Sequence, residues 1–149
     1  MPNFSRRSRL NLDQCHNDII AVCNELILIQ DFSVLFGKRT AEEQFDLYIK
    51  GRKFIGGKWK ITNKNKVVTY CDGHIKKSDH QENEDGVSDA IDIVSYPINW
   101  KDTINANYLA GAFMGVAHRL KMQGVIESSF GWGGRWKRFK DLYHFYRIK

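Results

Sequence analysis

The chain has 149 residues, a length that fits a single domain. Its hydrophobic content of 42% and charged content of 27% are ordinary for a globular protein, and they exclude a chain that is disordered along most of its length. The net charge of +6 is consistent with simple solubility and also with attraction to a polyanion, either a nucleic acid or an acidic cell wall.

The sequence shows neither a membrane span nor a targeting signal. No stretch approaches the ~20 apolar residues that a transmembrane helix requires, and no apolar signal segment follows the first residues, Met1–Arg7. We therefore expect synthesis in the cytoplasm without an export signal. The three cysteines, Cys15, Cys23 and Cys71, form no CxxC pair, so we expect reduced thiols and no cysteine zinc site.

The first half of the chain predicts two helices and a strand between them. Apolar residues recur at helical spacing over residues 11–30 and predict one amphipathic helix. The short apolar segment Phe32–Phe36 predicts a strand. Thr40 with Glu43 three residues later forms a capping-box pattern, which predicts a helix of about ten residues that carries Gln44 and ends near Gly51.

The second half predicts two loops, three strands and one helix. In chain order these are a Gly/Lys/Asn-rich loop over 51–66, a strand over 67–70, a long polar loop over 71–88, a strand over 90–94, a helix over 104–122 and a final strand over 144–148. Helices interleaved with short strands, without a regular βαβ rhythm, predict an α+β domain with a small central antiparallel sheet flanked by helices.

Three polar residues in these elements form a candidate metal site. Asp92 lies between Ile91 and Ile93, so strand alternation places its carboxylate on the face opposite the two isoleucines. His80 closes the long polar loop, and His144 begins the final strand. Two histidines and one carboxylate form a common ligand set for catalytic zinc. Spacing alone is a weak signal, because such a trio occurs in many chains by chance.

Four short motifs resemble the family of zinc D,D-carboxypeptidases and L-alanyl-D-glutamate endopeptidases, most of all its phage endolysin branch. They occur in the family's order, and they are Gly37–Gln44, Ser78-Asp79-His80, Ala90-Ile91-Asp92-Ile93, and Trp132-Gly133-Gly134 with Asp141–Phe145. The resemblance implies the hedgehog/D,D-peptidase fold over residues 1–149 as one catalytic domain, without a separate wall-binding domain. The interval between His80 and Asp92 is longer than is usual in the family, which leaves Asp89 and Asp85 as alternative ligands.

The resemblance also implies roles for individual residues. His80, Asp92 and His144 are expected to hold Zn²⁺, and Asp141 to act as the catalytic base. For Asp141 to lie beside the metal, a turn is required at residues 142–143. Arg39 is expected to stabilise the negative charge of the transition state or to hold a substrate carboxylate. Other expected contributors to ligand orientation, substrate contact or the cleft wall are Ser78, Gln44, Trp132 and Trp136.

The implied function is hydrolysis of the L-Ala–D-Glu bond in peptidoglycan stem peptides, which leads to host cell lysis. We expect a monomer that does not bind nucleic acid, forms no stable membrane association, and passes from the host cytoplasm to the wall by holin-type release. The main alternative is a D-Ala-D-Ala carboxypeptidase with the same zinc site. A nucleic-acid-binding module and a metal-binding relative without activity also fit the composition. The acidic segment Glu82–Asp85 has the composition of a Ca²⁺ loop, but solvated charge is the favoured interpretation.

Overall fold

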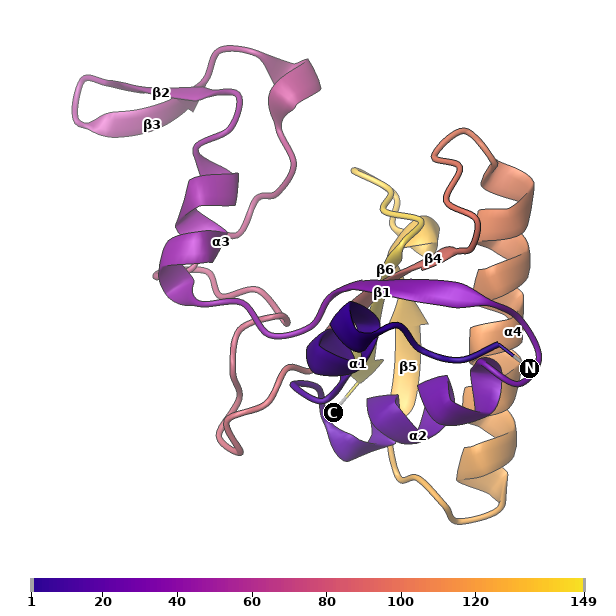
Figure 1. Cartoon of the computed structure of the whole chain (residues 1–149). Coiled ribbons are helices and arrows are strands. Elements are labelled where there is room, and N and C mark those ends of the chain that lie inside the picture. Colours follow the sequence, from indigo (N-terminus) through magenta and orange to yellow (C-terminus); the bar gives the residue numbers. More distant parts are fainter. Residues whose placement is uncertain (1, 149) are drawn as a thin grey trace.

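The centre of the molecule is a four-stranded antiparallel sheet in the order β1-β4-β6-β5 (Figure 1). The computed structural model describes residues 2–148. The strands of this sheet are β1 (Phe32–Phe36), β4 (Ala90–Ser95), β5 (Ser129–Trp132) and β6 (His144–Ile148). The helices are α1 (Arg6–Leu12), α2 (Asn17–Leu26), α3 (Ala41–Tyr48) and α4 (Thr103–Met122). The predicted α+β class with a small antiparallel sheet is confirmed.

One face of the sheet is buried under α2 and α4. Polar side chains of the strands therefore lie on the opposite face. Ile91 and Ile93 of β4 are fully buried in the same apolar cluster as Phe113 of α4. Phe145 of β6 joins them, with its ring centroid 4.4 Å from that of Phe113. Because side chains alternate along a strand, Asp92 is left on the opposite face.

The predicted helix over 11–30 is wrong in extent, because two helices occupy this region. α1 ends at Leu12 and α2 begins at Asn17. Between them the chain pairs with Ser88, whose carbonyl accepts from the backbone of His16 at 2.9 Å. The Nδ1 atom of His16 accepts from the backbone of Asp18 and caps α2. The apolar spacing continues across this break, which explains why the sequence pattern concealed it.

The predicted loop over 51–66 is also wrong, because much of it forms a hairpin of β2 (Arg52–Ile55) and β3 (Lys58–Ile61). Gly56 and Gly57 form its turn with φ angles of 60° and 77°. Two central residues with positive φ define the tight hairpin turn that glycine pairs favour. The predicted strand over 67–70 does not form. A short 3₁₀ turn, η1 (Lys64–Lys66), leads instead into an irregular segment.

The other predicted elements are close to those observed. α3 carries the predicted capping box, in which the backbone of Thr40 donates to Glu43 and the backbone of Glu43 donates to the Thr40 hydroxyl. Residues 71–88 contain no helix or strand beyond isolated bridges, as predicted. β5 was not predicted, and it precedes a second 3₁₀ turn, η2 (Gly133–Arg135).

All three cysteines are free thiols, in agreement with the prediction. Cys15 and Cys23 are buried in the core, and burial raises the pKa of the Cys15 thiol to about 12. Among residues 2–148, no helix combines the length and the hydropathy needed to cross a bilayer.

Candidate metal centre

The structure brings His80, Asp92 and His144 together on the open face of the sheet. Asp92 and His144 lie opposite each other in the β4–β6 pairing. His80 reaches the same point from the 71–88 segment. The His80 Nε2, His144 Nδ1 and Asp92 Oδ1 atoms form a triangle in which each side is 3.1 Å. Residues separated by 64 positions in the sequence therefore meet at one point.

The size of this triangle fits a tetrahedral metal ion. Zinc bonds to nitrogen and oxygen are about 2.0–2.2 Å long, so tetrahedral coordination separates two ligand atoms by about 3.3–3.6 Å. The three atoms here are only slightly closer together. They therefore match three corners of a tetrahedron without any rearrangement of the backbone.

The hydrogen bonding of His80 gives a second reason to expect a cation. Its Nδ1 atom lies 2.8 Å from the carbonyl oxygen of Gly37. A carbonyl oxygen can only accept, so Nδ1 carries a proton, and Nε2 is the atom turned toward Asp92 Oδ1, 3.1 Å away. A metal cation at this point would contact both Nε2 and the carboxylate, so this orientation of the ring is the one that a metal site needs. An imidazole oriented by a backbone carbonyl is a frequent arrangement in metal sites.

The segment before α3 holds His80 from two directions. The carbonyl of Gly37 accepts from the ring, and the backbone of Arg39 donates to the carbonyl of His80 at 2.8 Å. A Cβ atom on Gly37 would lie 2.1 Å from the carbonyl oxygen of Asn11, so only glycine fits. Ser78 accepts a weak hydrogen bond from the His80 backbone at 3.3 Å, which shapes the turn that presents the ring. Ser78 thus contacts the backbone of a candidate ligand, and its role in orienting that ligand stays a prediction.

Asp92, and neither of its acidic neighbours, supplies the carboxylate. Asp89 pairs with Arg147 at 2.9 Å and accepts from Asn83, while Asp85 is exposed in the 81–88 loop. Burial opposes ionisation of Asp92, but the charge and hydrogen bonds of His80 and His144 outweigh it and lower the pKa of this carboxyl well below its ordinary value. The carboxylate is therefore ionised and able to bind a cation.

Arg39 lies beside the three candidate ligands. Its Nη2 atom is 3.8 Å from Asp92 Oδ2, and its side chain is only 13% exposed. Its Nη1 atom donates to Gln44 Oε1 at 2.9 Å. Gln44 is fully buried in α3, and its amide nitrogen donates to the Cys71 carbonyl and to the Thr69 hydroxyl. Gln44 thus fixes the guanidinium of Arg39 rather than contacting the cavity itself.

Asp141 precedes a turn at residues 142–143, as the interpretation of this residue as a base requires. The backbone of Tyr143 donates to its carboxylate at 3.1 Å. Burial, and then the negative charge of Asp92, raise the pKa of Asp141 above its ordinary value. A carboxyl with a raised pKa beside a metal-ligand cluster is suited to accept and return a proton.

Trp132 is placed against the core and not in the cavity wall. Its indole Nε1 donates to the carbonyl of Leu142 at 2.9 Å, so it holds the turn that carries Asp141. The indole lies on Gly134, where a Cβ atom would come within 2.2 Å of the ring. Trp136 does line the cavity. Trp132 therefore packs against the core, and Trp136 faces the cavity.

A cavity of about 620 Å³ opens onto the cluster. Its wall includes the three candidate ligands together with Arg39, Asp141 and Ser78. The wall continues along the irregular segment 68–71 and the loop 136–141. The sequence did not predict the wall residues Thr69, Tyr70, Arg138 and Phe139. Thr69 and Tyr70 belong to the segment that was predicted as a strand, and Arg138 and Phe139 belong to the loop before Asp141, so no motif in the chain marked these four residues as cavity wall.

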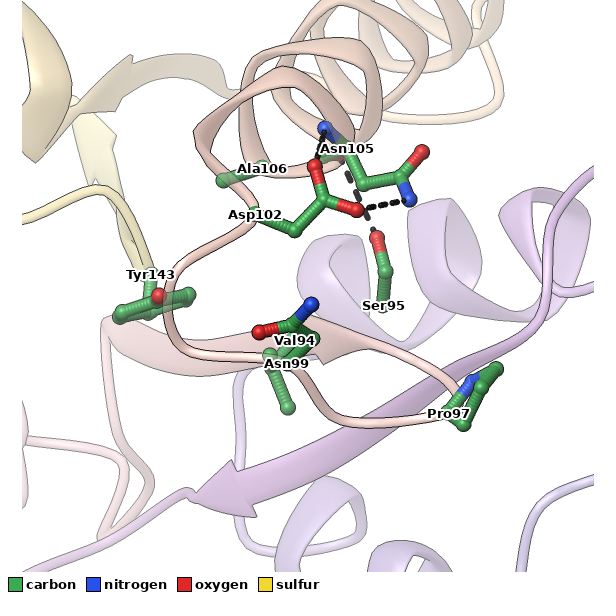
Figure 2. A pocket seen from close by; sticks show the side chains of 8 residues that line it. All are labelled: Val94, Ser95, Pro97, Asn99, Asp102, Asn105, Ala106 and Tyr143. Carbon is green, nitrogen blue, oxygen red and sulfur yellow. Dashed lines mark hydrogen bonds between the residues drawn. The ribbon is translucent and has the colours of Figure 1, made fainter.

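A second hollow lies where α4 begins, between the end of β4 and Asp102 (Figure 2). Its volume is about 10 Å³, which is room for about one water molecule. The Asp102 carboxylate is turned toward Asn105 and caps α4 (Figure 2). This hollow lies beside the helix cap, and it is too small to hold a substrate.

Comparison with solved structures identifies the fold. The chain is similar to an L-Ala D-Glu endopeptidase of Serratia marcescens, ChiX, with a TM-score of 0.65 and 23% sequence identity over 97% of this chain and 89% of that chain. No protein-family model and no curated protein matches the sequence. The chain therefore shares its fold with a peptidase, and this confirms the fold that the resemblance implied.

Proposed function

We propose that this protein is a zinc metallopeptidase that hydrolyses the L-Ala–D-Glu bond of peptidoglycan stem peptides. The observation that carries the proposal is the triangle of His80, Asp92 and His144 with Asp141 beside it in one cavity. The shared fold with an L-Ala D-Glu endopeptidase supports the choice of this bond over a terminal D-Ala–D-Ala bond.

The proposed ligands of the zinc ion are His80 Nε2, Asp92 Oδ1 and His144 Nδ1. Zinc bound by two imidazoles and a carboxylate polarises a carbonyl group and makes water a nucleophile near neutral pH. The protein's own contribution is to hold the three donor atoms in place before binding. The Gly37 carbonyl fixes the tautomer of His80, and strand pairing fixes Asp92 against His144.

Asp141 acts as the base in this proposal and Arg39 as the electrostatic partner. Asp141 accepts the proton of the attacking water and then delivers it to the departing amine of the D-Glu residue. Arg39 donates to the carbonyl oxygen of the scissile bond as negative charge develops there. Gln44 holds the guanidinium in position for this contact.

The proposed biological role is that of a phage-type endolysin. The enzyme would be made in the host cytoplasm and would reach the wall after holin-type release. It would act as a monomer, and its substrate would be the stem peptide itself. The similarity of the four sequence motifs to the phage branch supports this role.

Digestion of purified Gram-negative peptidoglycan tests the proposed reaction. We expect new N-terminal D-Glu residues, detected by end-group labelling, and no release of free D-Ala. Asp141→Asn should reduce the rate by about 10²–10⁴-fold because proton transfer is lost, while the zinc content stays unchanged. Released D-Ala would support the carboxypeptidase alternative. Intact peptidoglycan after treatment with the zinc-loaded wild type would contradict the proposal.

A further inference from the structure

The positive charge of the protein is concentrated in one short segment. The chain carries 23 basic and 17 acidic residues. Residues 50–66 contain seven of the basic residues and none of the acidic ones, so the rest of the chain, with 16 basic and 17 acidic residues, is close to neutral. The net charge of the molecule is therefore a property of the β2–β3 hairpin and the residues that flank it.

The hairpin separates its side chains onto two faces. The cross-strand pairs Arg52–Ile61 and Phe54–Trp59 share one face, and this face packs toward α3. There the ring centroid of Trp59 lies 5.8 Å from that of Phe45, and Arg52 lies over Tyr48. The alternating pairs Lys53–Lys60 and Ile55–Lys58 form the other face. The three lysines on that face are all exposed.

The tip of the hairpin is apolar and exposed. Phe54 and Ile55 directly precede the Gly56–Gly57 turn, and they are 62% and 47% exposed. The hairpin projects beyond α3 and away from the central sheet (Figure 1). An apolar tip followed by lysines is the arrangement of an element that enters the boundary between headgroups and acyl chains while its cations contact phosphates.

We propose that the β2–β3 hairpin is a docking surface for a lipid bilayer that carries anionic phosphate headgroups. Phe54 and Ile55 enter the interface, and Lys53, Lys58 and Lys60 contact the headgroup phosphates. This is peripheral binding, and it departs from the expectation, drawn from the sequence, that the protein forms no stable membrane association. It does not depend on the proposed peptidase function, because vesicle binding is measured without substrate or zinc.

The side chains favour lipid over nucleic acid as the anionic partner. Binding to a single strand uses aromatic planes on which bases stack. Trp59 is already engaged by Phe45 and Phe54, with ring centroids 5.8 Å and 5.5 Å away. Ile55 offers no plane at all. An exposed aliphatic side chain at the tip gains free energy only from an apolar phase.

Co-sedimentation with vesicles tests the proposal using the full-length protein. The vesicles contain either phosphatidylcholine alone or a mixture with phosphatidylglycerol. The test variant is Lys53→Gln/Lys58→Gln/Lys60→Gln, and the matched control is Arg6→Gln/Arg7→Gln/Lys101→Gln, which removes the same charge from exposed positions elsewhere. Because each lysine near an anionic surface strengthens binding several-fold, the hairpin variant should lose roughly 100-fold in partitioning onto anionic vesicles. The control should change by less than about 3-fold, since its cations lie off the proposed surface.

A second variant, Phe54→Ser/Ile55→Ser, keeps the charge and removes the apolar tip. It should weaken binding at low salt and abolish the part of the binding that survives high salt, because salt screens only the lysine contacts. Thermal unfolding confirms that all variants are folded. Equal losses in the hairpin and control variants would overturn the proposal. So would a wild type that binds single-stranded DNA through these lysines but sediments with neither type of vesicle.

Discussion

The backbone of Gly133 lies directly against that of Asp141. The Asp141 amide donates to the carbonyl of Gly133 at 3.1 Å. A Cβ atom on Gly133 would lie 2.5 Å from the Asp141 carbonyl oxygen and 3.1 Å from the Asp141 Cβ. The first glycine of the Trp-Gly-Gly motif therefore sets the position of the proposed base by its lack of a side chain.

Gly133→Ala should displace Asp141 and slow the reaction without loss of zinc. The new Cβ atom would clash with the backbone carbonyl of Asp141, so one of the two segments must move. A displacement of about 1 Å at a reacting group costs on the order of 10²-fold in rate. Turbidity loss of a peptidoglycan suspension measures the rate, and metal analysis measures the zinc content.

The matched control for this variant is Gly111→Ala on the exposed side of α4. Nothing lies within 4 Å of a Cβ atom there. Because alanine favours helix over glycine, this change should stabilise the fold by up to about 1 kcal/mol and leave the rate unchanged. A Gly133→Ala variant with the wild-type rate would show that the position of Asp141 does not limit the reaction.

Gln44→Met should lower both stability and activity. The variant keeps the approximate volume of the side chain but removes the hydrogen bonds to Arg39, Thr69 and Cys71. Buried partners left without hydrogen bonds cost about 1–3 kcal/mol, which urea unfolding measures. The rate should also fall because the guanidinium of Arg39 loses its fixed orientation.

The neighbouring substitution Asp46→Asn serves as its control, because Asp46 is exposed on the same helix. Its effect on the free energy of unfolding should stay within about 0.5 kcal/mol. If Gln44→Met lowered stability but left the rate unaltered, Gln44 would serve the fold alone and not the positioning of Arg39.

Asp18 links α2 to the segment before β5 in a pH-dependent way. Its Oδ2 atom accepts from the hydroxyl and the backbone of Ser128 and from the backbone of Glu127. Burial alone would raise the pKa of Asp18, but these hydrogen bonds outweigh it and lower the pKa below its ordinary value. A carboxyl with a lowered folded-state pKa stabilises the fold above its unfolded pKa of about 3.9, and this contribution is lost as the pH falls through the folded pKa.

Asp18→Asn should therefore cost about 1 kcal/mol at neutral pH, since the ionised acceptor is lost. The difference from wild type should remain constant from pH 7 down to about pH 5 and shrink below about pH 4. Urea unfolding at a series of pH values measures it, with Asp85→Asn in the exposed loop as control. A difference that grew toward acid pH would contradict this assignment.

The sequence predicted best those features that depend on local chemistry. The capping box of Thr40 and Glu43 and the strand alternation around Asp92 need only neighbouring residues, and both are present in the structure. The convergence of His80 with His144 is a long-range contact that spacing alone did not predict. The resemblance of the four motifs supplied it.

The features that the sequence did not predict depend on contacts between distant segments. The break before α2 depends on pairing with Ser88, which no helical periodicity reveals. The role of Trp132 depends on the Leu142 carbonyl. The hairpin is a different case, because Gly56-Gly57 is a turn signal that lysine-rich surroundings concealed.

The zinc content of the purified protein tests the central claim most directly. After zinc loading and dialysis, we predict one zinc ion per chain by elemental analysis. His80→Ala and His144→Ala should each lose the ion, while Asp141→Asn and the control His118→Ala, on the exposed side of α4, should keep it. A wild type that retains no zinc, or a His144→Ala variant that retains it as tightly as wild type, would contradict the account.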